Sequence, residues 1–124
     1  VQYRRIMALE DFDRFDLSSY RVKFCTSAPF PVELKRDILA RWPGGLVEFY
    51  GMTEGGASTV LVAHEHPDKL HTVGRVAPNS EMKLIDEDGR ELPPGGVGEV
   101  VGRGPMMMNG YHRCDEASRA AEWF

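Results

Sequence analysis

The chain has 124 residues, 42% of them hydrophobic, so it can bury one modest core, alone or with an extension. Its 15 lysines and arginines are outnumbered by 19 acidic residues, which gives a formal charge of −4, and they are scattered instead of forming the basic stripe that nucleic acid binding needs. Nucleic acid is therefore not an expected partner, and the longest apolar runs, at residues 60–63 and 105–108, are too short for a transmembrane helix.

A helix and a strand are expected near the start of the chain. Leu9, Phe12 and Phe15 approximate a spacing of three to four residues, which predicts an amphipathic helix at residues 9–15. Residues 22–25 read VKFC and predict a short strand.

The clearest helix pattern covers residues 31–41. Pro31 suits its first turn, and Glu33 favours the positive end of the helix dipole. The Pro-Gly-Gly run at residues 43–45 ends this helix, and residues 46–50 predict a second strand. The order strand, helix, strand is typical of a right-handed crossover that joins parallel strands.

The pattern changes near residue 72. We therefore expect an α/β segment at residues 1–72 and a strand-rich segment at residues 73–124. The expected fold class is α/β, with part of a parallel α/β layer followed by a small antiparallel, barrel-like β subdomain.

The second segment carries strand and turn signals in alternation. Residues 81–86 and 98–103 predict strands, and Asp88-Gly89 is the sharpest hairpin signal in the chain. A further helix could begin at Asp115, with this residue as its cap.

The cysteines and the chain ends also carry information. Cys25 and Cys114 are far apart, and no secretory signal is present, so we expect reduced thiols and a cytoplasmic location. The chain opens at Val1 without an initiator Met and stops at Trp123 and Phe124, whose rings would need covering. We expect an excised segment, whose exposed core surface could cause self-association.

The residues best suited to chemistry follow the second predicted strand, in the run Tyr50-Gly51-Met52-Thr53-Glu54-Gly55-Gly56. Ligands of open α/β sheets bind beyond the carboxyl ends of the strands. The three glycines would let backbone amides approach a phosphate, and the tyrosine could stack on a nucleobase. The glutamate could supply the single carboxylate that Mg²⁺ often takes from a protein.

This run resembles the signature of the adenylate-forming superfamily, which includes acyl-CoA synthetases, aryl-CoA ligases, luciferases and peptide-synthetase adenylation domains. Further matches occur in the family's order, and they span nearly the whole chain: Thr26-Ser27-Ala28-Pro29, Val73-Gly74-Arg75-Val76, and Gly95 to Val100 through Asn109-Gly110-Tyr111. The last motif is implied to support the site structurally.

The resemblance implies a nucleotide site. Ser27, Ala28 and Pro29 match the segment that lies against the adenine, although a glycine often seen there is absent. Tyr50 matches the aromatic residue that stacks on adenine, and Gly51 and Met52 are expected to bind the same cofactor.

The resemblance also implies catalytic and substrate-binding residues. Thr53 matches the hydroxyl that contacts the adenylate phosphate, and Glu54 matches the magnesium-linked carboxylate. Gly51 and Gly55 are expected beside the acyl pocket, and Gly74 on the acyl or pantetheine passage.

The reaction implied for a longer parent enzyme has two steps. A carboxylic acid and ATP, with Mg²⁺, give acyl-AMP and pyrophosphate, and coenzyme A then displaces AMP. The phosphate loop, the ribose-binding aspartate and the catalytic lysine of the family are not found in this sequence, so the chain alone is expected to form no adenylate. A carrier-protein acceptor and a non-catalytic nucleotide-binding domain are the alternatives, and fatty, aryl and short-chain acids all stay open as substrates.

Three other features allow a second interpretation. Ser27 could suggest a hydrolase nucleophile, but it lacks the glycine-flanked elbow of such enzymes. The histidines of residues 64–66, together with His71, could suggest zinc, although exposed loop histidines are the simpler interpretation. Residues 106–108 are three methionines that we expect to fill core gaps.

Overall fold

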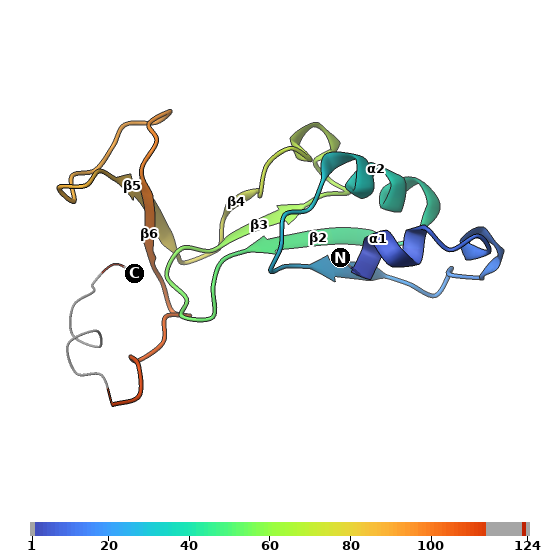
Figure 1. Cartoon of the computed structure of the whole chain (residues 1–124), viewed down its shortest axis with the longest axis horizontal. Helices are drawn as coiled ribbons and strands as arrows, with labels where there is room; N and C mark the ends of the chain where they lie inside the picture. Colours follow the sequence, from blue (N-terminus) through green and yellow to red (C-terminus); the bar gives the residue numbers. More distant parts are fainter. Residues whose placement is uncertain (1, 114–122, 124) are drawn as a thin grey trace. The chain divides into compact units, whose positions relative to one another are not determined.

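The computed structural model describes residues 2–113 and 123 (Figure 1). The chain forms two compact units, one of Val1–Tyr50 with Val60–Arg75, and the other of Gly51–Thr59 with Val76–Phe124. The loop at residues 51–59 therefore groups with the second unit, whereas the division predicted at residue 72 placed it in the first segment.

A four-stranded sheet has the order β1-β2-β3-β4. Its strands are β1 (Val22–Cys25), β2 (Gly45–Tyr50), β3 (Thr59–Val62) and β4 (Arg75–Val76). β1 and β2 are parallel, with Val22 opposite Gly45 and Cys25 opposite Glu48. Both strands and their direction agree with the prediction, whereas β3 and β4 were not predicted.

Helix α2 (Val32–Arg41) connects β1 to β2, which confirms the predicted crossover. Pro31 lies at the N-cap, one position before its expected place in the first turn. After the helix, Gly44 adopts a positive φ of 85°, and a Cβ on it would lie 2.6 Å from the Tyr20 carbonyl oxygen. Glycine is therefore required where the chain turns from α2 into β2.

The core of the first unit is a single hydrophobic cluster. It consists of Met7, Phe12, Ile38, Trp42, Leu46, Leu61, Ala63 and Leu70. Ile38 of α2, Trp42 at the C-cap of this helix and Leu46 of β2 are all buried. Burial of this apolar surface fixes the helix against the sheet that carries the candidate site.

The helix predicted at residues 9–15 is wrong. The structure instead has α1 (Gln2–Met7) and a short 3-10 helix, η1 (Phe12–Arg14), with a second 3-10 helix, η2 (Pro67–Lys69), later in the unit. Phe12 is buried, but Leu9 and Phe15 are 51% and 56% exposed. The apolar spacing therefore does not produce a buried helix face, and only one tight turn forms.

The described part of the second unit contains an antiparallel pair, β5 (Glu81–Ile85) and β6 (Glu99–Arg103). The predicted hairpin follows β5: the Gly89 N–H donates to the Asp86 carbonyl oxygen at 3.0 Å, and Gly89 has a φ of 77°. This two-stranded sheet is not closed into the barrel that the sequence suggested, at least over the described residues.

Two further expectations concern the end of the chain and membranes. The helix predicted from Asp115 lies outside the described residues. The ring of Trp123 is covered by two cations of the second unit, with Lys83 Nζ 4.0 Å and Arg103 Cζ 4.6 Å from its centroid. Among the helices that the structure describes, none is both long enough and apolar enough to span a membrane.

Candidate functional site

Tyr50 is the last residue of β2 and is 45% exposed. Earlier along the strand, Leu46 and Glu48 are buried, so the strand is anchored while its carboxyl end stays open to solvent. The tyrosine side chain is thus open to solvent at the end of a parallel strand, and its stacking on a base stays a prediction.

The segment Ser27-Ala28-Pro29 follows β1 after one residue, Thr26, and all three residues are exposed. Cys25 and Glu48 are opposite each other in the sheet, so this segment and Tyr50 follow the same edge of two neighbouring strands. Ser27 has a φ of 73°, a conformation that costs a non-glycine residue roughly 1–3 kcal/mol and often occurs at functional sites.

A cavity adjoins this segment within the first unit. Its walls include Thr26, Ala28 and Pro29, together with Arg4 and Arg5 of α1. Cys25 also lines it, and burial raises the pKa of this thiol, with the nearby Glu48 carboxylate acting in the same direction. The thiol therefore stays protonated near neutral pH, which makes it a poor nucleophile.

The loop that follows Tyr50 presents Thr53 at the surface. The Gly55 N–H donates to the Met52 carbonyl oxygen at 3.1 Å, which closes a turn with Thr53 and Glu54 at its centre. Gly55 has a φ of 85°, and a Cβ there would lie 2.4 Å from the Met106 carbonyl oxygen. Close backbone packing therefore explains why this residue is glycine, and its contact with substrate stays a prediction.

Glu54 is held on both its backbone and its side chain. Its carbonyl oxygen accepts the Met108 N–H at 2.8 Å, and its Oε1 accepts the Tyr111 hydroxyl at 3.1 Å. Sequence reasoning gave Tyr111 a general supporting role but missed this contact, because nothing local in the sequence relates residues 57 positions apart. Met106 is 79% exposed, so it does not fill a core gap as expected.

Gly74 has a local structural reason for being glycine. Its φ is 90°, and a Cβ would lie only 2.0 Å from the Val60 carbonyl oxygen. The Gly74 N–H donates to Thr72 Oγ1 at 3.1 Å. The backbone of β3 therefore excludes any side chain here, and the expected contact with the acyl or pantetheine chain stays a prediction.

The predicted residues are divided between the two units. Ser27, Ala28, Pro29, Tyr50 and Gly74 belong to the first, whereas Gly51, Met52, Thr53, Glu54 and Gly55 belong to the second. Within each unit the structure provides exposed functional groups on fixed backbone, as a binding site requires.

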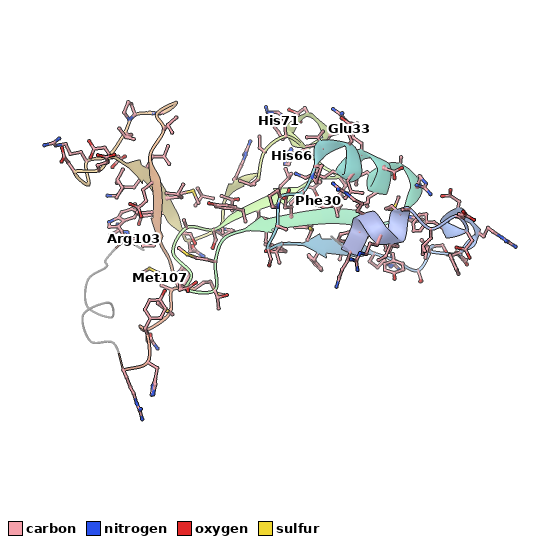
Figure 2. All side chains as sticks on the ribbon, in the orientation of Figure 1. Phe30, Glu33, His66, His71, Arg103 and Met107 are labelled. Carbon is pink, nitrogen blue, oxygen red and sulfur yellow. The ribbon has the colours of Figure 1, made fainter. Side chains whose placement is uncertain are left out.

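The residues present suit Mg²⁺ better than zinc. The described part of the chain holds no group of three or more histidine, cysteine or acidic side chains that could bind a metal ion. His64 Nδ1 lies 3.2 Å from the backbone nitrogen and oxygen of Leu46, and Figure 2 shows His66 and His71 on the segment after β3. One carboxylate, Glu54, fits an ion that takes most of its ligands from substrate phosphates and water.

Comparison with known proteins gives consistent matches. The family model described as "AMP-binding enzyme" matches residues 2–112. The chain is 39% identical over 114 residues to 4-coumarate–CoA ligase 1 of Glycine max, covering 87% of this chain and 39% of that protein. It is 34% identical over 121 residues to a feruloyl-CoA synthase of Amycolatopsis sp, covering 95% of this chain and 24% of that protein.

A solved structure agrees with these sequence matches. The amide bond synthetase McbA of Marinactinospora thermotolerans superposes with a TM-score of 0.82 at 31% identity, covering 98% of this chain and 26% of that one. The chain thus spans well under half the length of each of these relatives.

Proposed function

Because the chain belongs to the AMP-binding enzyme family, we propose that it is part of a longer ATP-dependent ligase that activates a carboxylic acid as acyl-AMP and transfers the acyl group to coenzyme A. The observation that carries this proposal is the family match over residues 2–112, which includes an exposed Tyr50 at the carboxyl end of β2. The CoA ligases among the relatives favour a thioester product.

The first unit would bind the adenosine part of ATP. Tyr50 would stack on the base, because its ring is exposed at a strand end. Ser27, Ala28 and Pro29 would contact the base from the neighbouring strand end, where Ser27 is already held in its unusual backbone conformation. Little reorganisation would then be needed when ATP binds.

The second unit would act on the phosphates. The Thr53 hydroxyl would donate to a phosphate oxygen, and Glu54, oriented by the Tyr111 hydroxyl, would hold Mg²⁺. When bound, that ion neutralises negative charge on the phosphate oxygens. These residues align ATP so that a carboxylate can approach the α-phosphorus in line.

The proposed reaction balances in two steps. The carboxylate oxygen bonds to the α-phosphorus, the bond to the β-phosphate oxygen breaks, and pyrophosphate leaves. The CoA thiol then gives its proton to solvent, its sulfur attacks the acyl carbonyl carbon, and AMP leaves with the electron pair of the broken carbon–oxygen bond. Most of the catalysis is positioning and charge neutralisation.

Among the acids left open by the sequence, we favour an aromatic one. Two relatives are named for 4-coumarate and ferulate.

The test is AMP release by the longer enzyme with MgATP and CoA, across hydroxycinnamic, benzoic, fatty and short-chain acids. We expect release that depends on both acid and CoA and is fastest with an aryl acid. Release only with fatty acids would contradict the aryl assignment, and no release with any acid would contradict the ligase.

An amine is a second candidate for the acceptor of the acyl group. The structural match to an amide bond synthetase shows that this fold also occurs in a protein named for joining an acid to an amine. Supplying CoA, a carrier protein or a simple amine in competition, and identifying the acyl product by mass, would separate these acceptors.

A further inference from the structure

Lys35 of α2 is a buried cation, with only 2% of its surface exposed. Its Nζ forms an ion pair with Glu48 of β2, which is also buried. The same nitrogen donates to the carbonyl oxygens of Leu70, at 2.9 Å, and Thr72, at 3.3 Å. An ammonium has three N–H donors, and here each has an acceptor.

Stability alone is a weak reason for such an arrangement. Removing two charges from water is costly, and apolar replacements of a buried ion pair are often as stable or more stable. Apart from this ion pair, Glu48 Oε2 has no hydrogen-bond partner among the described residues. Removing either residue would therefore leave a buried charge without its partner. The role of the pair is better explained by the segments that it holds in place.

The partners of Lys35 lie next to three segments that carry predicted site residues. Its Nζ is 5.6 Å from the ring centroid of Phe30, which directly follows Pro29 and leads into α2 (Figure 2). Glu48 lies two residues before Tyr50 on the same strand. Thr72 lies two residues before Gly74, and the Thr72 hydroxyl accepts the Gly74 N–H.

We propose that Lys35 is a positioning residue that joins these three segments, so that the adenine-contacting segment, Tyr50 and the turn at Gly74 keep a fixed relation within the first unit. This inference rests on the proposed function, because it assigns those segments to ATP and to the acyl or pantetheine passage. Loss of the Lys35 contacts should weaken substrate binding more than it slows the reaction of the bound substrates.

Lys23 of β1 provides a matched control. It is a second buried lysine of the same unit, at 3% exposure, and its Nζ donates to the carbonyl oxygens of Trp42, Pro43 and Gly44 at 3.0, 2.8 and 2.7 Å. These acceptors lie between α2 and the amino end of β2, the opposite end from Tyr50. Loss of Lys23 should therefore disturb stability without moving the predicted site.

The experiment compares Lys35→Met, the apolar double variant Lys35→Met/Glu48→Leu, and Lys23→Met in the active longer enzyme. Lys35→Met leaves Glu48 unpaired, so its Tm should fall, and the double variant should regain most of that loss. We expect both to raise the KM for ATP and for CoA about tenfold, with a smaller change in kcat. Lys23→Met should lower the Tm and leave both KM values unchanged.

Two results would overturn the inference. One is a double variant with wild-type Tm and wild-type KM values, since the Lys35 contacts would then be structural only. The other is Lys23→Met raising KM as much as Lys35→Met does, which would show a general effect of destabilisation. If the Lys35 variants do not fold, Glu48→Gln, which keeps the side-chain volume, takes their place with the same expected KM change. Inactivity of the wild-type enzyme would count against the proposed function instead.

Discussion

At the scale of single residues, the roles proposed for Tyr50 and Glu54 depend on different features. Tyr50 offers an exposed ring at a strand end. Glu54 offers a carboxylate that accepts the Tyr111 hydroxyl, and its backbone carbonyl oxygen accepts the Met108 N–H. Both positions were predicted from the sequence because their residue types are informative locally. The partner of the glutamate could not be predicted, since it depends on how distant parts of the chain fold.

Replacing Tyr50 with alanine should weaken ATP binding. Stacking of a base on an aromatic ring is worth roughly 1–3 kcal/mol, so the KM for ATP should rise about tenfold or more, while Tyr50→Phe keeps the ring and should change it little. Steady-state kinetics of both variants in the longer enzyme measures this. Equal effects of the two substitutions would show that the hydroxyl, not the ring, is important.

Replacing Glu54 with glutamine should raise the Mg²⁺ concentration needed for activity and lower kcat/KM by about one to two orders of magnitude, because the metal loses its anionic ligand. The control is Tyr111→Phe, which removes the hydrogen bond at 3.1 Å but keeps the carboxylate and should have a smaller effect. A Mg²⁺ titration of each variant distinguishes them. An unchanged Mg²⁺ requirement in Glu54→Gln would remove Glu54 from the metal site.

At the scale of elements, local signals decided what could be predicted. The β1-α2-β2 crossover was foreseen because Pro31 and the Pro-Gly-Gly run mark both ends of α2. The strand β3 (Thr59–Val62) was not predicted, because no clear turn signal marks the ends of this four-residue run. Its place in the sheet depends on pairing with strands that are distant in the sequence. The ion pair and the hydrogen bonds of Lys35 could not be predicted either, because they involve residues 13 to 37 positions away.

The junction between β3 and β4 gives a stability prediction. Gly74→Ala should lower the free energy of unfolding by more than about 1 kcal/mol, because the new methyl group meets the Val60 carbonyl oxygen in a backbone conformation that alanine disfavours. Gly89→Ala is the matched control: its φ is also positive, at 77°, but a Cβ there meets nothing within 4 Å.

Urea unfolding of the two glycine variants and the wild type provides the measurement. We expect Gly74→Ala to be clearly the less stable variant, since only it adds a steric clash to the backbone strain. Equal losses in the two variants would mean that the close approach of Gly74 to Val60 is relieved at little cost.

At the scale of the whole molecule, the candidate motif crosses the boundary between the two units, since Tyr50 ends a stretch of the first unit and Gly51 begins a stretch of the second. The chain spans 39% of one CoA ligase relative and 24% of another, so we predict that the 124-residue chain by itself forms no acyl-adenylate. A cytosolic location also stays a prediction.

We propose that this chain carries part of an adenylate-forming site. Acid-dependent exchange of labelled pyrophosphate into ATP is the first measurement to make, because exchange reports the first half-reaction whatever the acceptor. We expect the longer enzyme to catalyse exchange that requires a carboxylic acid, is fastest with an aryl acid, and falls sharply in Glu54→Gln. Exchange that does not require an acid, or ATP binding without any exchange across the acid panel, would contradict it.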